Sequence, residues 1–420
     1  MNTILVGVHW GDEGKGKIID FLTETNDVVI RSQGGNNAGH TVEIGKKQYI
    51  LHLIPSGILR PGKKCIIGHG TVIDPFSLKH EIEELHDKKI KTKGRLFISN
   101  MAHMVLPHHR IADAGNENSK KVKIGTTKRG IGPAYQDKVS RTGFRLGDLL
   151  HAETFEKKLR LRIKEVNRQH RFNGWKSVSA QSLIRELKTI GEFLNPYICN
   201  TVHTLHKMMD EKKALLFEGA QGTFLDIDYG TYPFVTSSNT TSGGACTGSG
   251  LPPAKVDHVI GVVKAYTTRV GEGPFPTQSE ELGDLLHGMG REFGATTGRA
   301  RRCGWFDGVL ARYSARVNGI DHIAVTNIDG LDGLDELKIC ESYKLDGKKI
   351  TYPPSSAEEL LRCKPVYTTL PGWKTDTSKA RSWKELPLKA RHYLNAIKSV
   401  MGGKLRIISV GPKREETFYL

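Results

Sequence analysis

The sequence has few cysteines and no paired spacing among them. Six cysteines are scattered through 420 residues, and none forms the Cys-x-x-Cys pattern of a zinc ribbon or the framework of a disulfide-rich domain. No stretch approaches the run of about 18 apolar residues that a membrane span needs, and the N-terminal residues lack the basic segment of a secretory signal. We therefore expect a cytoplasmic protein with reduced thiols and no membrane partner.

Acidic residues are scarce relative to basic ones. Lys and Arg total 62 against 45 Asp and Glu, a formal net charge of +17, which raises nucleic acid, acidic membranes and anionic small substrates as candidate partners. The densest basic stretch, residues 157–171, places Leu159, Ile163 and Val166 at helical spacing and contains no interleaved aromatic residues. That pattern favours a solvent-exposed amphipathic helix over a nucleic-acid platform, so we expect no specific nucleic-acid partner.

Short, continuous apolar runs alternate with helical patterns along the chain. Such runs are typical of strands buried on both faces of a parallel sheet, and they cover residues 3–8, 27–31, 65–67, 96–99, 214–217, 259–263, 323–326 and 405–410. Residues 150–212 have the pattern of a helical insertion, and Lys338 to Tyr352 alternate around Asp346-Gly347 as a hairpin does. We predict one α/β domain over residues 1–420, with a central, mostly parallel sheet of the P-loop NTPase kind and small hairpin elaborations.

The loop after the first predicted strand has the pattern of a phosphate-binding loop. Residues 11–17 are Gly-Asp-Glu-Gly-Lys-Gly-Lys, which satisfies GxxxxGK between a strand and a helix, where backbone N–H groups and a helix N-terminus hold phosphate. The next residue is Ile18 instead of the Ser or Thr that normally binds Mg²⁺. Asp12, inside the loop, is therefore the predicted oxygen ligand of the metal.

A second loop rich in glycine and asparagine, residues 33–40, follows the second predicted strand and ends at His40. An imidazole there is suited to act as a general acid or to stabilise a phosphoryl oxygen during transfer. We expect this loop to lie close to the first one if the two strands are neighbours in the sheet.

Further loops with glycine, hydroxyl groups and cations follow other predicted strands, at residues 124–141, 218–223 and 236–241. Residues 294–302 contain three arginines, whose guanidinium forks suit a dicarboxylate or a phosphate. Asp329 follows a strand and is suited to accept from the ring N–H and amino group of guanine, a pair of donors that adenine lacks. Because open α/β sheets bind ligands at strand ends, these loops favour one nucleotide site.

Together these motifs resemble the adenylosuccinate synthetase family over essentially the whole chain. The matching segments are WGDEGKGK at 10–17, NAGHT at 37–41, LHLIPSGIL at 51–59, GTTxRGIGPAY at 125–135, FEGAQG at 217–222, TYPxVTSSNTT at 231–241, TRVGxGPFPT at 268–277 and EFGATTGR at 292–299. The resemblance implies a GTP-dependent ligase that joins IMP and L-aspartate through 6-phosphoryl-IMP and releases adenylosuccinate, GDP and phosphate. This reaction is the first committed step of AMP synthesis from IMP, and the resemblance implies a homodimer with one Mg²⁺ per subunit.

The resemblance also implies a role for each matched position. In catalysis, Asp12 would take the ring proton of IMP, His40 would act on the phosphoryl oxygens, and Gln221 would assist them. The GTP contacts would be Gly11, Glu13, Gly14, Lys15, Gly16, Lys17, Gly39, Thr41, Arg301, Asn327, Asp329, Ser409 and Gly411. The IMP contacts would be Asp12, Asn37, Thr127, Gln221, Thr236 and Arg299, together with Arg141 from the partner subunit. L-aspartate would bind Thr296, Thr297, Arg299 and Arg301, and Mg²⁺ would bind Asp12 and the Gly39 carbonyl.

The chain departs from the family pattern at four positions. Asn327 replaces the usual Lys of TKxD, so the stacking of a lysine stem on guanine is lost; Lys128 replaces a glycine, Ala300 interrupts an arginine run, and Asn36 stands where histidine is common.

Two other interpretations of the function remain. One is a basic RNA-binding or scaffolding protein that has kept the fold and lost the activity. The other is an ordinary P-loop GTPase or kinase, which leaves the arginine-rich loop unexplained.

Overall fold

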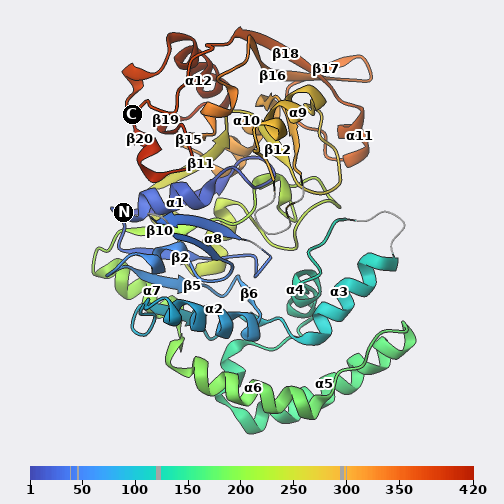
Figure 1. The fold of residues 1–420 in the computed structure, drawn as a ribbon. Coiled ribbons are helices and arrows are strands. Elements are labelled where there is room, and N and C mark those ends of the chain that lie inside the picture. Colours follow the sequence, from blue (N-terminus) through green and yellow to red (C-terminus); the bar gives the residue numbers. More distant parts are fainter. Residues whose placement is uncertain (38, 45–46, 120–123, 294–297, 299) are drawn as a thin grey trace.

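A ten-stranded sheet runs through the centre of the molecule (Figure 1). The computed structural model describes residues 1–37, 39–44, 47–119, 124–293, 298 and 300–420, with the backbone alone for 40–44, 47 and 48. From edge to edge the strands are β20 (Thr417–Tyr419), β19 (Lys404–Ser409), β15 (His322–Thr326), β11 (His258–Lys264), β1 (Asn2–Gly7), β10 (Leu215–Glu218), β2 (Val28–Arg31), β5 (Lys64–Ile67), β7 (Leu96–Ser99) and β9 (Ile198–Cys199). All neighbours pair in parallel except β19 and β20.

Each of the eight predicted apolar runs forms a strand of this sheet, with its ends within one residue of the prediction. Alternate side chains enter two separate cores. Leu5, Val29 and Leu216 belong to one core, whereas Ile4, Val28 and Phe217 belong to the other, and all are fully buried. Burial on both faces explains why these strands are apolar without alternation, and the predicted α/β fold with a mostly parallel sheet is confirmed.

Helices cover both faces of the sheet. On the face of Leu5 lie α1 (Lys15–Thr23) and α2 (Pro75–Asp87), whose apolar residues share its core. On the face of Ile4 lie α7 (Thr201–Asp210), α8 (Ser242–Ser249), α9 (Glu280–Gly288), α10 (Gly308–Asn318) and α12 (Leu388–Met401). Among the described residues, no helix is long and apolar enough to cross a bilayer.

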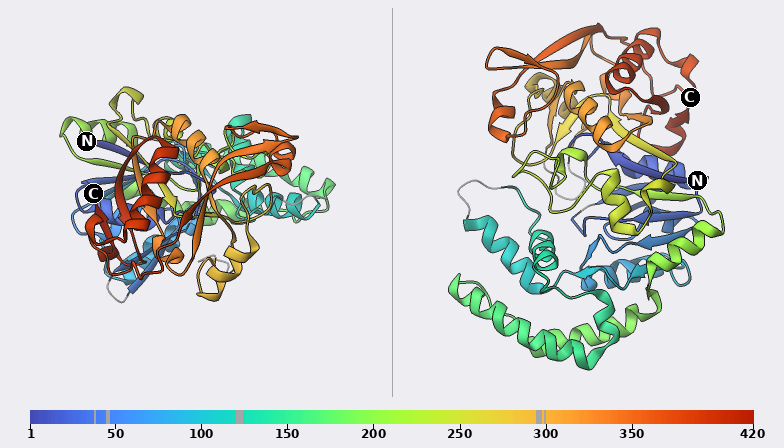
Figure 2. Two further views of the ribbon diagram at one scale, coloured as in Figure 1. Left: turned by 90° about the horizontal axis from the view of Figure 1, so that it is seen from above. Right: turned by 180° about the vertical axis from the view of Figure 1, so that it is seen from behind.

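Two long helices, α5 (Ala152–Phe172) and α6 (Ala180–Leu194), extend away from the sheet as an arm (Figures 1 and 2). Leu159, Ile163 and Val166 are buried while the charged residues between them are mostly exposed, so the predicted amphipathic helix is confirmed. The segment 150–212 is not helical throughout, because Ile198–Cys199 forms strand β9 and pairs with β7. Two residues are too few to show a period in the sequence.

A second, four-stranded sheet contains β14 (Phe306–Asp307), β16 (Glu336–Leu345), β17 (Lys348–Ile350) and β18 (Lys364–Pro371). The predicted hairpin joins β16 to β17, with Asp346 and Gly347 at positive φ in the turn. Strand β18 was not predicted, since most of its side chains are polar or only partly buried. The remaining elements are β3 (His40–Ile44), β4 (Lys47–Leu51), β6 (Val72–Ile73), β8 (His103–Met104), α3 (Pro107–Ser119), α4 (Ile131–Ser140), β12 (Thr267–Arg269), β13 (Arg302–Gly304) and α11 (Ala357–Arg362).

Candidate active site

The loops with predicted functions follow strands whose carboxyl ends share one edge of the main sheet. The first two loops are expected to lie close together if their strands are neighbours, and that condition is not met, because β10 lies between β1 and β2. The loop after β10 joins them instead. A Cβ placed on Gly11 would lie 3.5 Å from Gln221 Cα, and Gln33 Nε2 donates to the Ala220 carbonyl at 2.8 Å. The loops after β1, β10 and β2 therefore meet at this edge.

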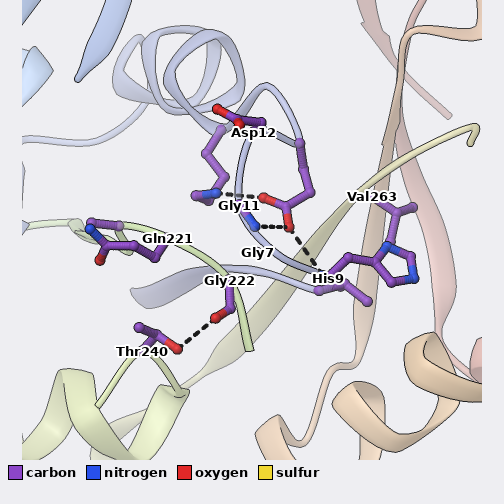
Figure 3. A network of polar contacts seen from close by, with 12 residues as sticks. Gly7, His9, Gly11, Asp12, Gln221, Gly222, Thr240 and Val263 are labelled. Carbon is purple, nitrogen blue, oxygen red and sulfur yellow. Dashed lines mark hydrogen bonds and ion pairs between the residues drawn. The ribbon is translucent and has the colours of Figure 1, made fainter. Parts of the chain in front are cut away.

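The phosphate-binding loop contains a buried ion pair of its own (Figure 3). The Glu13 carboxylate accepts from the backbone N–H groups of His9 and Gly11, both at 3.0 Å, and Lys15 Nζ donates to it at 2.5 Å. Gly11 and Gly14 both adopt left-handed backbone conformations, which glycine adopts without strain. Gly14 forms the N-cap of α1 without a side-chain cap, so the first N–H groups of the helix are available to a phosphate.

Lys17, in the first turns of α1, links the phosphate-binding loop to the far part of the sheet. Its Nζ donates to Ser409 Oγ, at the last residue of β19, and to the Gly411 carbonyl two residues later. Burial lowers the pKa of Lys17 to about 8. The structure thus brings Ser409 and Gly411 beside the phosphate-binding loop.

Asp12, at the tip of the loop, forms an ion pair with an arginine from the other side of the site. Arg301 Nε lies 3.1 Å from Asp12 Oδ2, and Arg301 Nη1 lies 3.1 Å from Glu292 Oε2. Burial by itself lowers the pKa of Arg301, but the two carboxylates raise it above its ordinary value. The guanidinium therefore stays charged and joins the phosphate-binding loop to the arginine-rich segment.

Behind Arg301 lies a buried cluster that the sequence analysis missed. Glu292 has a side chain only 2% exposed, and it accepts from Lys264 Nζ at 2.6 Å and from the Tyr266 hydroxyl at 2.5 Å. Burial raises the pKa of Glu292, but Lys264 and the other donors around the carboxylate lower it to about 2. One signal was present in the sequence: Lys264 ends an otherwise apolar strand, where a buried cation needs a partner.

Asp329, the predicted reader of guanine, is buried at the end of the site near β15. Its Oδ2 accepts from Arg291 Nη2 at 2.6 Å, and its Oδ1 has no hydrogen-bond partner in the part of the chain that the structure describes. Asn327 precedes it in the left-handed conformation, with Nδ2 3.5 Å from the Tyr266 hydroxyl. The unpartnered Oδ1 is an acceptor of the kind that a base N–H requires.

The predicted IMP contacts surround a neighbouring part of the edge. Asn37 Oδ1 is buried without a partner among the described atoms, and the Thr236 N–H donates to the Leu225 carbonyl at 2.8 Å. Thr127 is exposed, and a Cβ on Gly132 would lie 3.3 Å from Ser237 Oγ. The segments around 127 and 236 therefore approach each other through α4.

Arg141 is not among the residues that meet at this edge. It is exposed at the C-cap of α4, in a left-handed conformation, and pairs with no described residue. His40 and Thr41 begin β3, opposite Leu51 and Ile50, with only their backbones described. Gly39 directly precedes them and is exposed, and Gly16 lies in the first turn of α1. Thr296, Thr297 and Arg299 lie outside the described residues.

Asp12 and Gly39 have the donor chemistry that Mg²⁺ prefers, a carboxylate and a backbone carbonyl. The Asp12 carboxylate is 35% exposed and its ion pair is with Arg301 alone among the described side chains, so it fits a metal ligand that exchanges its partner. Two histidine–aspartate clusters lie elsewhere in the fold: His108, His109 and Asp137, and His258, Asp321 and His322.

A family model described as adenylosuccinate synthetase matches residues 4–418. The chain belongs to the adenylosuccinate synthetase family. It is 52% identical to the adenylosuccinate synthetase of Carboxydothermus hydrogenoformans, over 99% of this chain and 98% of that protein. It is 50% identical to that of Listeria welshimeri, over 99% and 97%.

Solved structures agree with this assignment. The fully ligated adenylosuccinate synthetase from Plasmodium falciparum superposes with a TM-score of 0.95 at 38% identity, covering 100% of this chain and 99% of that one. A succinoaminodeoxyadenylate synthetase of cyanophage S-2L, bound to dGMP and dATP, has a TM-score of 0.63 at 20% identity and shares the fold alone. As an adenylosuccinate synthetase family member the chain is a ligase that forms a C–N bond, which decides against an ordinary P-loop GTPase or kinase.

Proposed function

We propose a separate role for each group of residues at the carboxyl edge in the reaction of this family. The reaction is the GTP-dependent ligation of IMP and L-aspartate to adenylosuccinate, with release of GDP and phosphate and with Mg²⁺ as cofactor. One observation carries the proposal: Arg301 bridges Asp12 on the phosphate-binding loop and Glu292 at the start of the arginine-rich segment. The groups for nucleotide chemistry and for carboxylate binding are therefore in direct contact.

In the first step Asp12 accepts the ring proton of IMP, and the six-oxo group becomes a nucleophile toward the γ-phosphoryl group of GTP. Lys15, Lys17 and the N-terminus of α1 hold the GTP phosphates. His40 stabilises the phosphoryl oxygens in transfer. When held by Asp12 and the Gly39 carbonyl, Mg²⁺ would neutralise phosphate charge.

In the second step the amine of L-aspartate attacks the purine carbon, and phosphate leaves with the bonding electrons. Arg301, with Arg299, Thr296 and Thr297, holds the carboxylates of L-aspartate, because guanidinium groups pair with carboxylate in a bidentate way. Converting a poor leaving oxygen into phosphate is what the consumption of GTP achieves.

The remaining assignments concern recognition. Asp329 accepts from guanine, supported by its unpartnered Oδ1, with Asn327, Ser409 and Gly411 beside the base. The IMP contacts are Asn37, Thr127, Gln221 and Thr236. The remaining predicted GTP contacts, Gly11, Glu13, Gly14, Gly16 and Thr41, lie in or next to the two loops near the phosphates.

We also infer a homodimer in which Arg141 reaches the IMP phosphate of the partner subunit. Arg141 is exposed at the C-cap of α4, and Val139 on the same helix is 81% exposed. On α5, Leu161 and Phe172 are 67% and 90% exposed, so apolar surface is available on both helices for a partner subunit to cover. Equal mixtures of inactive Arg141→Leu and Asp12→Asn subunits should regain activity, since a mixed dimer contains one intact site.

The cytoplasm remains the compartment that we propose. All six cysteines are free thiols, and five of them are buried, which suits a reducing compartment. Fractionation of cells expressing the chain at native level tests this directly.

The decisive experiment incubates the purified protein with IMP, L-aspartate, Mg²⁺ and either GTP or ATP, and follows the absorbance change as hypoxanthine becomes the succinylated adenine. We expect turnover with GTP. No turnover with either nucleotide would contradict the ligase assignment. A steep, salt-dependent affinity for RNA would then favour the interpretation as a scaffold.

A further inference from the structure

The base of the arginine-rich segment is closed by a pair of facing residues, Glu292 and Arg301. The Arg301 N–H donates to the Glu292 carbonyl at 2.8 Å, and Phe293 and Ala300 form an antiparallel bridge beside them. The same two residues are joined again through their side chains, at 3.1 Å. The backbone and side chain of Arg301 are therefore both fixed relative to Glu292.

Glu292 is an unusual residue for a purely structural position. Its backbone is left-handed, with φ at 61°, which a residue with a Cβ adopts only at a cost. Its carboxylate is buried and accepts from two cations and a tyrosine hydroxyl. Burying several charges together is expensive, and an apolar cluster of the same volume would generally serve stability as well.

The two cations, Lys264 and Arg301, differ in the groups to which they donate hydrogen bonds. Among the described residues, Lys264 Nζ donates only to buried groups, namely Glu292 and Thr268 Oγ1 at 3.0 Å. Arg301 instead donates from Nη1 to Glu292 Oε2 at 3.1 Å and from Nη2 to Asp12 Oδ1 at 3.4 Å. Its Nε lies 3.1 Å from Asp12 Oδ2, within ion-pair distance but without the geometry of a hydrogen bond. Since a guanidinium is planar and its donors are fixed in a fork, holding one side of it determines where the other side points.

We propose that Glu292 is a positioning residue for the substrate L-aspartate. With Lys264 and Tyr266 it fixes one side of the Arg301 guanidinium, so that the other side is presented to a carboxylate at the tip of the phosphate-binding loop. In the structure that side of the guanidinium faces the Asp12 carboxylate, and in the working complex it binds a carboxylate of L-aspartate. The inference rests on the proposed assignment of Arg301 to L-aspartate.

The chain contains a matched control for this cluster. Asp307 is also fully buried, caps α10, and accepts from the hydroxyl of Tyr343 at 2.7 Å, as Glu292 accepts from Tyr266. It bonds to none of the proposed substrate contacts. Tyr266→Phe and Tyr343→Phe therefore each remove a hydrogen bond to a buried carboxyl group, and Glu292→Gln and Asp307→Asn each replace a buried carboxyl group by an amide.

The experiment measures KM for each substrate and kcat in all four variants. We expect Glu292→Gln to raise the KM for L-aspartate at least about tenfold and Tyr266→Phe to raise it about threefold, with the KM for IMP within twofold of the parent. The Asp307→Asn and Tyr343→Phe variants should keep the parent KM for L-aspartate, whatever their loss of thermal stability. If Glu292→Gln fails to fold, the test rests on comparing the KM for L-aspartate in Tyr266→Phe with that in Tyr343→Phe.

A double-mutant cycle with Arg301→Ala then shows whether Glu292 acts through that arginine. We expect Glu292→Gln to add no further rise in the KM for L-aspartate when Arg301 is already alanine. An equal rise with and without Arg301, or a fall in kcat at constant KM, would overturn the positioning role. Absence of turnover in the unmodified protein would instead contradict the ligase assignment, so the two failures are distinguishable.

Discussion

The carboxyl edge of the sheet and the arm formed by α5 and α6 differ in what they bury: the arm buries apolar side chains, whereas the edge also buries charged ones. In the arm, Leu159 and Ile163 are buried at helical spacing on α5, and charges such as the Glu156–Arg160 pair are at the surface. At the edge, Glu13 and Glu292 are buried, and backbone strain gathers in the loops. The arm thus contributes apolar burial, whereas the edge keeps charged groups in fixed positions at a cost that the rest of the fold must offset.

The contrast predicts that a substitution at the edge removes activity without loss of stability. Asp12→Asn should lower kcat at least about a thousandfold, because the group that accepts the IMP proton is gone. Its partly exposed position should leave the thermal midpoint near that of the parent. Steady-state kinetics and thermal unfolding measure both. The control is Asp346→Asn, which breaks an exposed ion pair between Asp346 in the hairpin turn and Arg362 on α11. Near-parent turnover in Asp12→Asn would refute the assignment.

In the arm the opposite outcome is expected. Leu159→Ala should lower the free energy of unfolding by about 2–5 kcal/mol, because it leaves a cavity at a fully buried position, while kcat stays within about twofold at temperatures where the protein is folded. Denaturant unfolding and activity measured together test this. The exposed Lys158→Ala on the same helix should change neither quantity, and a kcat loss without destabilisation would show that the arm reaches the site.

The buried cation Lys17 predicts opposite pH effects on activity and stability. Its pKa of about 8 means that the charge which binds phosphate is lost above that pH, so kcat/KM for GTP should fall up to tenfold per pH unit. The unfolded chain, with an ordinary lysine pKa, binds more protons between about pH 8 and 10.5, so this group makes the folded state more stable as pH rises there. Lys17→Arg should move the fall in kcat/KM to higher pH; an unmoved profile would assign it to another group.

The smallest effect is expected at Asn327. Asn327→Lys restores the usual family residue and should lower the KM for GTP about threefold, because the lysine stem can stack on guanine. It should slightly lower the thermal midpoint, since the left-handed conformation of residue 327 suits asparagine better than lysine. KM values for GTP and ATP in both proteins measure the change. An equal gain for ATP would show that residue 327 does not act on the base.

The same contrast explains how much of the structure the sequence could predict. Strands buried on both faces, the arm helices and the hairpin each repeat a local pattern, so their positions followed from spacing alone. The contact of Lys264 with Glu292, or of Arg291 with Asp329, depends on segments far apart in the sequence that only the folded chain brings together. The roles of Asp12 and His40 were suggested by family motifs, and their geometry required the strand order, in which β10 separates β1 from β2.

The chain segments on both sides of the arm are hydrogen-bonded to one residue, Asn100, which directly follows β7. The Gly147 N–H donates to the Asn100 carbonyl at 2.8 Å just before the arm, and the Asn100 N–H donates to the Cys199 carbonyl at 2.9 Å just after it. The chain therefore leaves the sheet and returns to it beside the same residue. In evolutionary terms the turn between α5 and α6, at the far end of the arm, is where the chain can gain or lose residues without moving β7 or β9.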